Sequence, residues 1–138
     1  METTADRSAG AGCVIAPWIS VKNGRGLEAV EFYKRAFGAE NLLLLDNEGG
    51  VVARMRVEGA EFWLADESPE NWNFSPETVG GVTTRLILVV EDPDALWDRA
   101  VAAGATGICA MTEEHGWRVG GVSDPFGHRW EMAREETK

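Results

Sequence analysis

The sequence carries one internal repeat, and this repeat constrains the fold more than any other feature. The dipeptide Gly38-Ala39 recurs as Gly104-Ala105, 66 residues later, and Trp63 recurs as Trp130, 67 residues later. In both halves the surrounding pattern predicts a strand, a helix and then three strands. Self-similarity at a fixed spacing indicates a duplicated unit that cannot bury its apolar face alone. We therefore expect an α+β fold of two βαβββ modules, with a ferredoxin-like fold, one strand shorter in each half, as the alternative.

The expected elements are short apolar runs separated by turn-forming residues. The strands are runs rich in β-branched and aromatic residues: 14–21, 41–45, 50–57 and 60–65 in the first half, and 83–90, 106–111, 117–123 and 128–133 in the second. Helical spacing of apolar residues predicts a helix over 27–37, with Gly38 as its left-handed C-cap. Asp92 followed by Pro93 predicts the start of a second helix. The nearly continuous β-branched run at 83–90 is typical of a strand buried on both faces.

These elements divide the chain into four segments of one structural domain. Residues 1–12 are small, polar and glycine-rich, so they are expected to form a flexible N-terminal arm. Residues 13–66 and 83–134 are the two modules. The stretch 67–82 contains proline and turn formers without a clear period, and is expected to be a linker that could also act as a lid.

The charge and the cysteine content limit the possible partners. The 138 residues carry a formal charge of −10 without clusters of Lys or Arg, which argues against nucleic acid and suits a cationic ligand. No apolar run approaches the roughly 20 residues that a membrane span needs. Cys13 and Cys109 are too few for a disulfide framework and are expected to be buried or incidental thiols. A cytoplasmic location is the resulting expectation.

Four segments carry a resemblance to a known family: VEFYKRAFGAE (30–40), FWLADE (62–67), VEDPDALWDRAVAAGA (90–105) and DPFGHRWEMA (124–133). They resemble successive landmarks of the vicinal oxygen chelate superfamily, which includes glyoxalases, bleomycin-resistance proteins and extradiol dioxygenases. The resemblance is greatest to its glyoxalase-like bacterial branch. It implies two curved, mixed four-stranded sheets that form a cup, helices outside the cup, and a homodimer with clefts near the subunit interface.

The same resemblance locates the metal-binding positions of the superfamily. Its enzymes hold a divalent metal with four side chains, one from the first and one from the last strand of each module. In this chain those positions are Ala16, Leu64, Arg85 and Glu131. Glu131 alone can donate to a metal, and an Arg in one position would repel the cation. We therefore expect no metal and no other cofactor, while a divalent ion held by other residues stays open.

Alternation along the strands predicts which side chains face the cup. By this count the cup-facing residues are Phe62, Leu64, Asp66, Arg129 and Glu131 in the last strands, and Trp18, Arg85, Ile87 and Val89 in the first. Trp63 and Trp130 are expected in the core instead. An apolar cup rimmed by indoles is typical of a small-molecule pocket. The predicted ligand-binding residues are Trp18, Phe62, Asp66, Trp72, Arg85, Trp117 and Glu131.

Some of the charged groups leave alternatives open. Arg85 and Glu131 are expected to form a buried ion pair that holds the two halves in register, although Glu131 is also a candidate general base. His128 is expected to bond across the DPFG turn or to backbone rather than to act in catalysis. His115 is expected in a solvated loop.

Three functions fit these features. The favoured hypothesis is a metal-independent protein that binds a small aromatic or cationic compound in the cup, as the drug-resistance members of the superfamily suggest. The alternative is an enzyme, either a lyase or isomerase with Glu131 as its catalytic base, or a metalloenzyme with relocated ligands such as Asp66 or His115. A third is a dimeric scaffold without a ligand.

Overall fold

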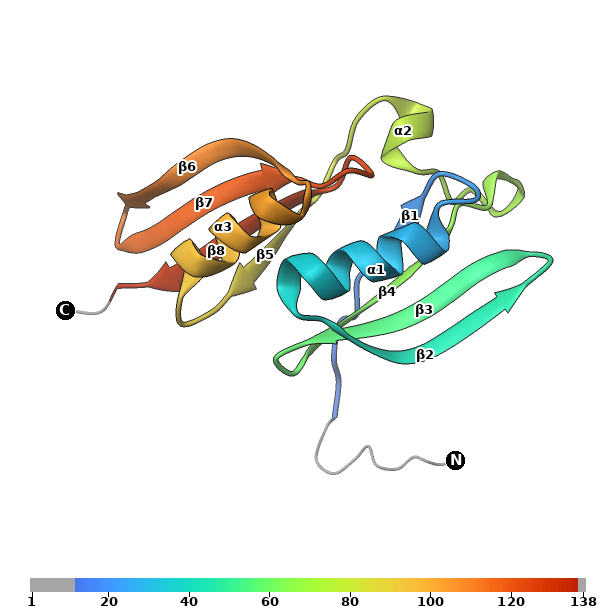
Figure 1. The fold of residues 1–138 in the computed structure, drawn as a ribbon, viewed down its shortest axis with the longest axis horizontal. Helices are drawn as coiled ribbons and strands as arrows, with labels where there is room; N and C mark the ends of the chain where they lie inside the picture. Colours follow the sequence, from blue (N-terminus) through green and yellow to red (C-terminus); the bar gives the residue numbers. More distant parts are fainter. Residues whose placement is uncertain (1–11, 137–138) are drawn as a thin grey trace.

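The computed structural model describes residues 12–136 and contains two modules of five elements each (Figure 1). The first module consists of β1 (Trp18–Val21), α1 (Gly26–Phe37), β2 (Glu40–Asn47), β3 (Gly50–Val57) and β4 (Ala60–Asp66). The second consists of β5 (Arg85–Val89), α3 (Pro93–Ala103), β6 (Thr106–Glu114), β7 (Trp117–Ser123) and β8 (Arg129–Glu135). Nearly all of the N-terminal arm expected at 1–12 lies outside the described residues.

Each module forms one four-stranded mixed sheet. The strand orders are β1-β4-β3-β2 and β5-β8-β7-β6; in both sheets the first pair is parallel and the other pairs are antiparallel. This repeated topology confirms the predicted α+β fold of two βαβββ modules and excludes the ferredoxin-like alternative. One expectation is wrong: β5 is not buried on both faces. It is an edge strand, and Ile87 and Val89 are 55% and 62% exposed.

The end of α1 and the start of α3 form as the sequence predicts. α1 ends at Gly38, whose left-handed conformation, with φ of 68°, is the one that a residue without Cβ tolerates best. The carboxylate of Asp92 accepts a hydrogen bond of 3.1 Å from the N–H of Ala95, and Pro93 occupies the first turn of α3. Within residues 12–136, none of the helices has the length and apolar character needed to cross a membrane.

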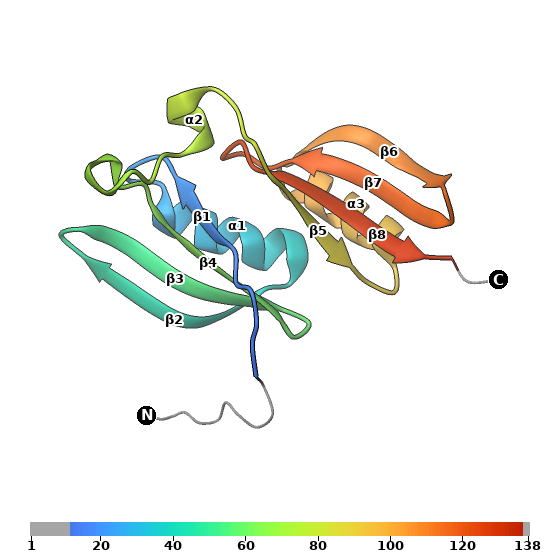
Figure 2. The same cartoon turned by 180° about the vertical axis from the view of Figure 1, so that it is seen from behind.

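The linker contains two short helices that the sequence pattern does not predict, η2 (Pro69–Asn71) and α2 (Pro76–Val79). The hydroxyl of Ser75 caps α2 by accepting a hydrogen bond from the N–H of Thr78. Glu67 accepts hydrogen bonds of 2.9 Å from the N–H of Ser75 and from the hydroxyl of Thr78, and these bonds lower the pKa of its carboxyl group. Figure 2 shows the linker crossing from the end of β4 to the start of β5.

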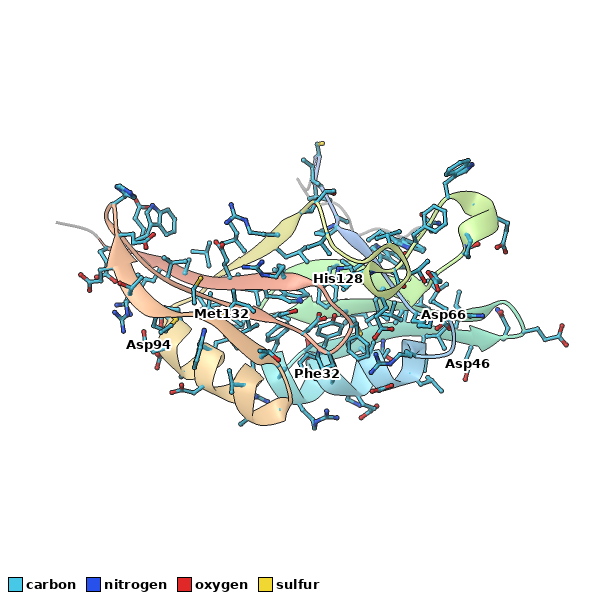
Figure 3. The ribbon with its side chains drawn as sticks, turned by 90° about the horizontal axis from the view of Figure 1, so that it is seen from above. Phe32, Asp46, Asp66, Asp94, His128 and Met132 are labelled. Carbon is cyan, nitrogen blue, oxygen red and sulfur yellow. The ribbon has the colours of Figure 1, made fainter. Side chains whose placement is uncertain are left out.

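One hydrophobic core is shared by both modules. α1 and α3 pack against each other on the same side of the two sheets (Figure 3). Phe32 and Phe37 of α1 reach into the second module, where Phe32 packs edge-on against Phe126 and Phe37 lies 4.8 Å from Trp130 between ring centroids. Trp130 is 2% exposed and is the core residue that the sequence predicts. Each helix covers the apolar face of its own sheet, and the aromatic contacts of α1 with Phe126 and Trp130 join the two modules into one core.

A buried carboxylate fixes the DPFG turn that leads into β8. Asp124 is 4% exposed and accepts hydrogen bonds from the hydroxyl of Tyr33 (2.5 Å), from the indole N–H of Trp130 (2.8 Å), and from the backbone N–H groups of Phe126 and His128 (2.9 Å each). Four donors satisfy a buried charge that would otherwise destabilise the fold. The network holds the turn against α1 and places His128 at the boundary between the modules (Figure 3).

Candidate functional site

The cup face is the side of the two sheets opposite α1 and α3. Side chains at paired positions of neighbouring strands point to the same face of a sheet. In the second module this face carries Arg85, Ile87 and Val89 from β5, and Arg129 and Glu131 from β8. The side chains at the intervening positions of these two strands turn toward the core.

In β4 of the first module the predicted alternation is wrong by one residue. Phe62 and Leu64 are 4% and 0% exposed and belong to the core, where Phe62 packs against Trp130 with 5.4 Å between ring centroids. Trp63, predicted in the core, lies half-buried on the cup face. The match of Trp63 to Trp130 does not relate equivalent positions. The 66-residue offset holds for the last strands, so Leu64 corresponds to Trp130, and Trp63 to Arg129.

A cavity of about 650 Å³ lies at the boundary between the modules, and we call it the seam cavity. Segments of β1, of the chain entering β5 and of the linker form its walls. Trp18 contributes an indole from β1, while Trp72 and Phe74 contribute aromatic rings from the linker. Among the described residues, His128 is the one titratable side chain of the lining, which contains no Asp or Glu. The size and composition match those of small-molecule pockets.

Two stacked indoles lie next to the seam cavity on the cup face. Trp18 and Trp63 are register partners on β1 and β4; their ring centroids are 5.9 Å apart and their planes differ by 13°. The guanidinium of Arg54 lies 6.0 Å from the Trp63 ring and forms an ion pair of 2.9 Å with Glu61. Trp18 is 50% exposed, so part of its ring is open to a flat ligand.

The linker wall of the seam cavity is held in place by Arg25. Its guanidinium forms ion pairs with Glu28 (2.7 Å) and with Glu77 of α2, donates to the carbonyl of Pro125 (3.2 Å), and lies 4.5 Å from the centre of the Phe126 ring. The hydrogen bond to Glu28 and the charge of Glu77 raise the pKa of Arg25. One cation therefore connects the loop before α1, the linker and the DPFG turn.

His128 bridges the two modules. Its Nε2 atom lies 2.7 Å from the carbonyl oxygen of Ser20, so the ring bonds to backbone, as expected. The ring also lines the seam cavity, a placement that no sequence signal indicates. His115 lies in the turn between β6 and β7 with φ of 53°, and lines neither this cavity nor the next one.

A second cavity, of about 790 Å³, is lined by residues 14–17, by the turn between β3 and β4, and by β5. Arg85 contributes to its lining, and Phe62 and Trp130 reach it from the core. Arg85 forms the predicted ion pair with Glu131, with Nη1 and Oε2 2.9 Å apart. The pair joins β5 to β8 within the second module, and the Arg85 side chain is 62% exposed, so the expectation of a buried pair that holds the two halves in register is wrong.

Three predicted ligand-binding residues line neither cavity: Asp66, Trp117 and Glu131, the last of which is paired with Arg85. Asp66 is 8% exposed, and its carboxylate accepts hydrogen bonds from the backbone N–H groups of Gly24 (2.9 Å), Gly26 (3.0 Å) and Val51 (2.7 Å). Asp66 thus fixes the loop that leads into α1 (Figure 3). Trp117 begins β7 next to the β6–β7 turn and lines neither cavity.

The donor set of the cup face does not fit a metal ion. With the corrected register, Ala65 replaces Leu64 as the equivalent of Glu131, and Trp18 replaces Ala16 as the equivalent of Arg85. The four positions then offer one donor, and that carboxylate is paired with Arg85. Within the described range 12–136, no group of three or more His, Cys, Asp or Glu side chains could hold a metal. Divalent metals in proteins need several such donors.

The family of the chain follows from its match to a family model. The model of the glyoxalase-like domain matches residues 24–133. The chain belongs to the glyoxalase-like domain family. This assignment confirms the resemblance to the vicinal oxygen chelate superfamily and agrees with the paired βαβββ modules.

Several proteins are similar to this glyoxalase-like chain. An uncharacterised protein of Mycobacterium tuberculosis is 35% identical over 112 residues, which cover 77% of this chain and 66% of that protein. A gene product of Arabidopsis thaliana of known structure is 27% identical, with a TM-score of 0.67 and coverage of 87% of this chain and 95% of that one. TnmS3, an antibiotic binding protein from Streptomyces sp. CB03234, is 20% identical, with a TM-score of 0.66 and coverage of 91% and 98%.

Proposed function

We propose that this glyoxalase-like protein binds a small planar aromatic compound in the seam cavity, without a metal ion. The observation that carries the proposal is the grouping of Trp18, Trp72 and Phe74 around one cavity. Aromatic stacking contributes about 0.5–1.5 kcal/mol per ring pair beyond the burial of apolar area. Because no carboxylate belongs to the described lining, the cavity favours an aromatic ligand over a cationic one.

The fold is compatible with such a role, since TnmS3, which has the same fold, is an antibiotic binding protein. The alternative of a lyase, isomerase or metalloenzyme lacks comparable support. Glu131 is engaged by Arg85, and within residues 12–136 neither Asp66 nor His115 joins it in a group that could hold a metal.

The proposal includes a homodimer in which a second copy covers the cup face. Trp18, Ile87 and Val89 are at least half exposed on this face, and Val14 and Ile15 just before β1 are 76% and 92% exposed. Monomeric proteins rarely expose contiguous apolar patches of large area. Sedimentation velocity is expected to give about twice the 15.0 kDa mass of the chain. A sharp monomer peak at micromolar concentration would contradict the dimer.

A cytoplasmic location completes the proposal. Cys13 and Cys109 are both exposed and unpaired, so of the two alternatives, buried or incidental thiols, the first is wrong. Exposed free thiols persist in reducing compartments, whereas oxidising ones convert thiols to disulfides. Fractionation of cells that produce the protein, followed by immunoblotting, tests this location.

Isothermal titration calorimetry with an uncharged planar probe, naphthamide, tests the binding function. We expect saturable binding at micromolar probe concentrations, unchanged after dialysis against EDTA. Mass spectrometry of the recovered probe is expected to show an unaltered compound. Recovery of a chemically altered probe, or loss of binding after chelation, would favour the enzyme alternatives instead.

A further inference from the structure

The two modules place different chemistry at equivalent positions of the cup face. Trp18 and Trp63 are register partners on β1 and β4, just as Arg85 and Arg129 are register partners on β5 and β8. The repeat relates Trp63 to Arg129 and Trp18 to Arg85, by offsets of 66 and 67 residues. A pair of stacked indoles in one module therefore corresponds to a pair of guanidinium groups in the other.

Of these two arginines, Arg129 has no counter-charge within the described residues. Its Nε atom is buried without a hydrogen-bond partner, and the guanidinium forms no ion pair within the described chain. Arg129 as a whole residue is partly exposed. Arg85, by contrast, is paired with Glu131, and Arg54 of the first module is paired with Glu61.

This lack of a counter-charge stands out in an acidic protein. The chain has 23 Asp and Glu against 13 Lys and Arg. Even so, no carboxylate in residues 12–136 lies within ion-pair distance of Arg129. Partial burial of a cation without an anion costs free energy, and a bound anion recovers it. The planar guanidinium matches the geometry of carboxylate and phosphate groups, to which it can donate two parallel hydrogen bonds.

The seam cavity meets the cup face at Trp18. Trp18 lines the cavity and lies on the cup face, which also carries Arg85 and Arg129, although neither arginine belongs to the lining itself. A ligand that occupies the cavity with its aromatic part can therefore extend an anionic group onto the cup face beside these arginines. Arg85, Arg129 and Glu131 together carry a net charge of +1 on this part of the cup face.

We infer that the aromatic ligand carries an anionic group, and that Arg129 binds this group. The inference rests on the proposed function, because the seam cavity receives the aromatic part. It assigns the ligand to the aromatic carboxylates, or to aromatic compounds with a phosphate group of the same recognition chemistry. Arg129 is thereby assigned as the residue that selects for charge.

Calorimetry with three naphthyl probes of similar shape tests the inference. Naphthoate is expected to bind about tenfold more tightly than naphthamide, since a charge-assisted hydrogen bond replaces a neutral one. Naphthylmethylamine, a cation, is expected to bind most weakly. In Arg129→Gln the affinity for naphthoate should fall to that for naphthamide, which itself should not change. Arg56→Gln is the matched control, because Arg56 is paired with Glu40 on β2, and should leave all three affinities unchanged.

Equal binding of naphthoate and naphthamide by the unmodified protein would overturn the inference and leave the proposed function standing. So would an Arg129→Gln variant that retains the preference for naphthoate. If Arg129→Gln instead dissociates a dimer in sedimentation velocity, the counter-charge comes from the second copy and the inference is wrong.

A measurement on Arg129 itself covers the case in which no naphthyl probe binds, which would refute the proposed function. The Nε–H signal of Arg129 can be assigned in a ¹⁵N NMR spectrum by its loss in Arg129→Lys. Titration with benzoate is expected to shift this signal with saturation, whereas benzamide should not shift it. A signal of the unmodified protein that benzoate leaves unmoved would overturn the inference, and the Arg129→Lys variant serves for the assignment alone.

Discussion

The hydroxyl of Tyr33 donates a hydrogen bond of 2.5 Å to Oδ2 of Asp124, across 91 positions of sequence. Tyr33 belongs to α1 of the first module, while Asp124 belongs to the turn before β8 of the second. Both side chains are buried. The bond therefore joins the modules inside the core, where no water can replace either partner.

The Tyr33–Asp124 bond predicts a loss of stability at alkaline pH. Burial, followed by the negative charge of Asp124, raises the pKa of Tyr33 well above its ordinary value of 10.0. A group whose pKa is raised on folding stabilises the folded protein at pH values below the pKa of that group in the unfolded chain. For Tyr33 this stabilisation decreases as the pH rises above about 10. The free energy of unfolding should therefore decline from pH 10 upward, by up to about 1.4 kcal/mol per pH unit from this group.

Tyr33 is the single tyrosine of the chain, so its ionisation can be followed directly by phenolate absorbance near 295 nm. The folded protein should show no phenolate at pH values at which a denatured sample is fully ionised. Tyr33→Phe should lose about 1 kcal/mol of stability at neutral pH and show a shallower alkaline decline. A phenolate signal with an ordinary midpoint in the folded protein would contradict the buried bond.

Asp66→Ala tests whether this carboxylate is structural. The substitution leaves the backbone N–H groups of Gly24, Gly26 and Val51 without their acceptor, and should reduce the free energy of unfolding by about 3 kcal/mol in urea titrations. Asp46→Ala, at an exposed position of β2, is the control and should change stability little (Figure 3). Unchanged stability of Asp66→Ala with lost probe binding would make Asp66 a ligand contact.

Trp18→Leu tests the exposed indole of the stacked pair. Loss of one aromatic stacking surface should weaken naphthamide binding by about five- to tenfold. The melting temperature should change little, because half of the Trp18 side chain is already in water. Trp117→Leu removes an indole that lines neither cavity, so its affinity should equal that of the unmodified protein. Equal affinities for the two variants would place the ligand elsewhere.

Glu77→Gln tests the ion pair between α2 and Arg25. Partly exposed ion pairs contribute about 0.2–1 kcal/mol, so the linker wall should loosen and the probe should dissociate about two- to fourfold faster. Stopped-flow displacement measures this rate. Glu31→Gln, which breaks an exposed pair with Lys34 within α1, should leave the rate unchanged. The difference between the variants should shrink in high salt, which screens the pair.

Much of the fold could be predicted because its signals are local. The left-handed cap at Gly38 and the start of α3 at Asp92 depend on a few neighbouring residues, and both form as the sequence indicates. The helices of the linker could not be predicted in this way. α2 is a single turn without a period, and its position depends on contacts with Arg25, which is distant in sequence.

The residues that line the site were harder to predict, because the alternation of apolar and polar residues gives no signal where several consecutive residues of a strand are apolar. Residues 62–65 read Phe-Trp-Leu-Ala, so either face of β4 could be the buried one. The structure buries Phe62 and Leu64 against α1 and Trp130, and leaves Trp63 to the cup. The match of Gly38-Ala39 to Gly104-Ala105 has the correct offset of 66 residues, whereas the match of Trp63 to Trp130, with 67, does not. The role of Asp66 as a backbone acceptor depends on a loop geometry that alternation does not encode.

The bond from His128 to the carbonyl of Ser20 crosses a boundary at which the described strands form no backbone ladder, because β1 and β5 are each paired on one side only. Within either sheet, moving two strands apart would break a whole row of hydrogen bonds. A small shear of α1 against α3, by contrast, changes the distance between the two sheets and breaks few hydrogen bonds. The width of the seam cavity therefore depends on how α1 packs against α3 and on single side-chain bonds such as that of His128, and not on a strand ladder.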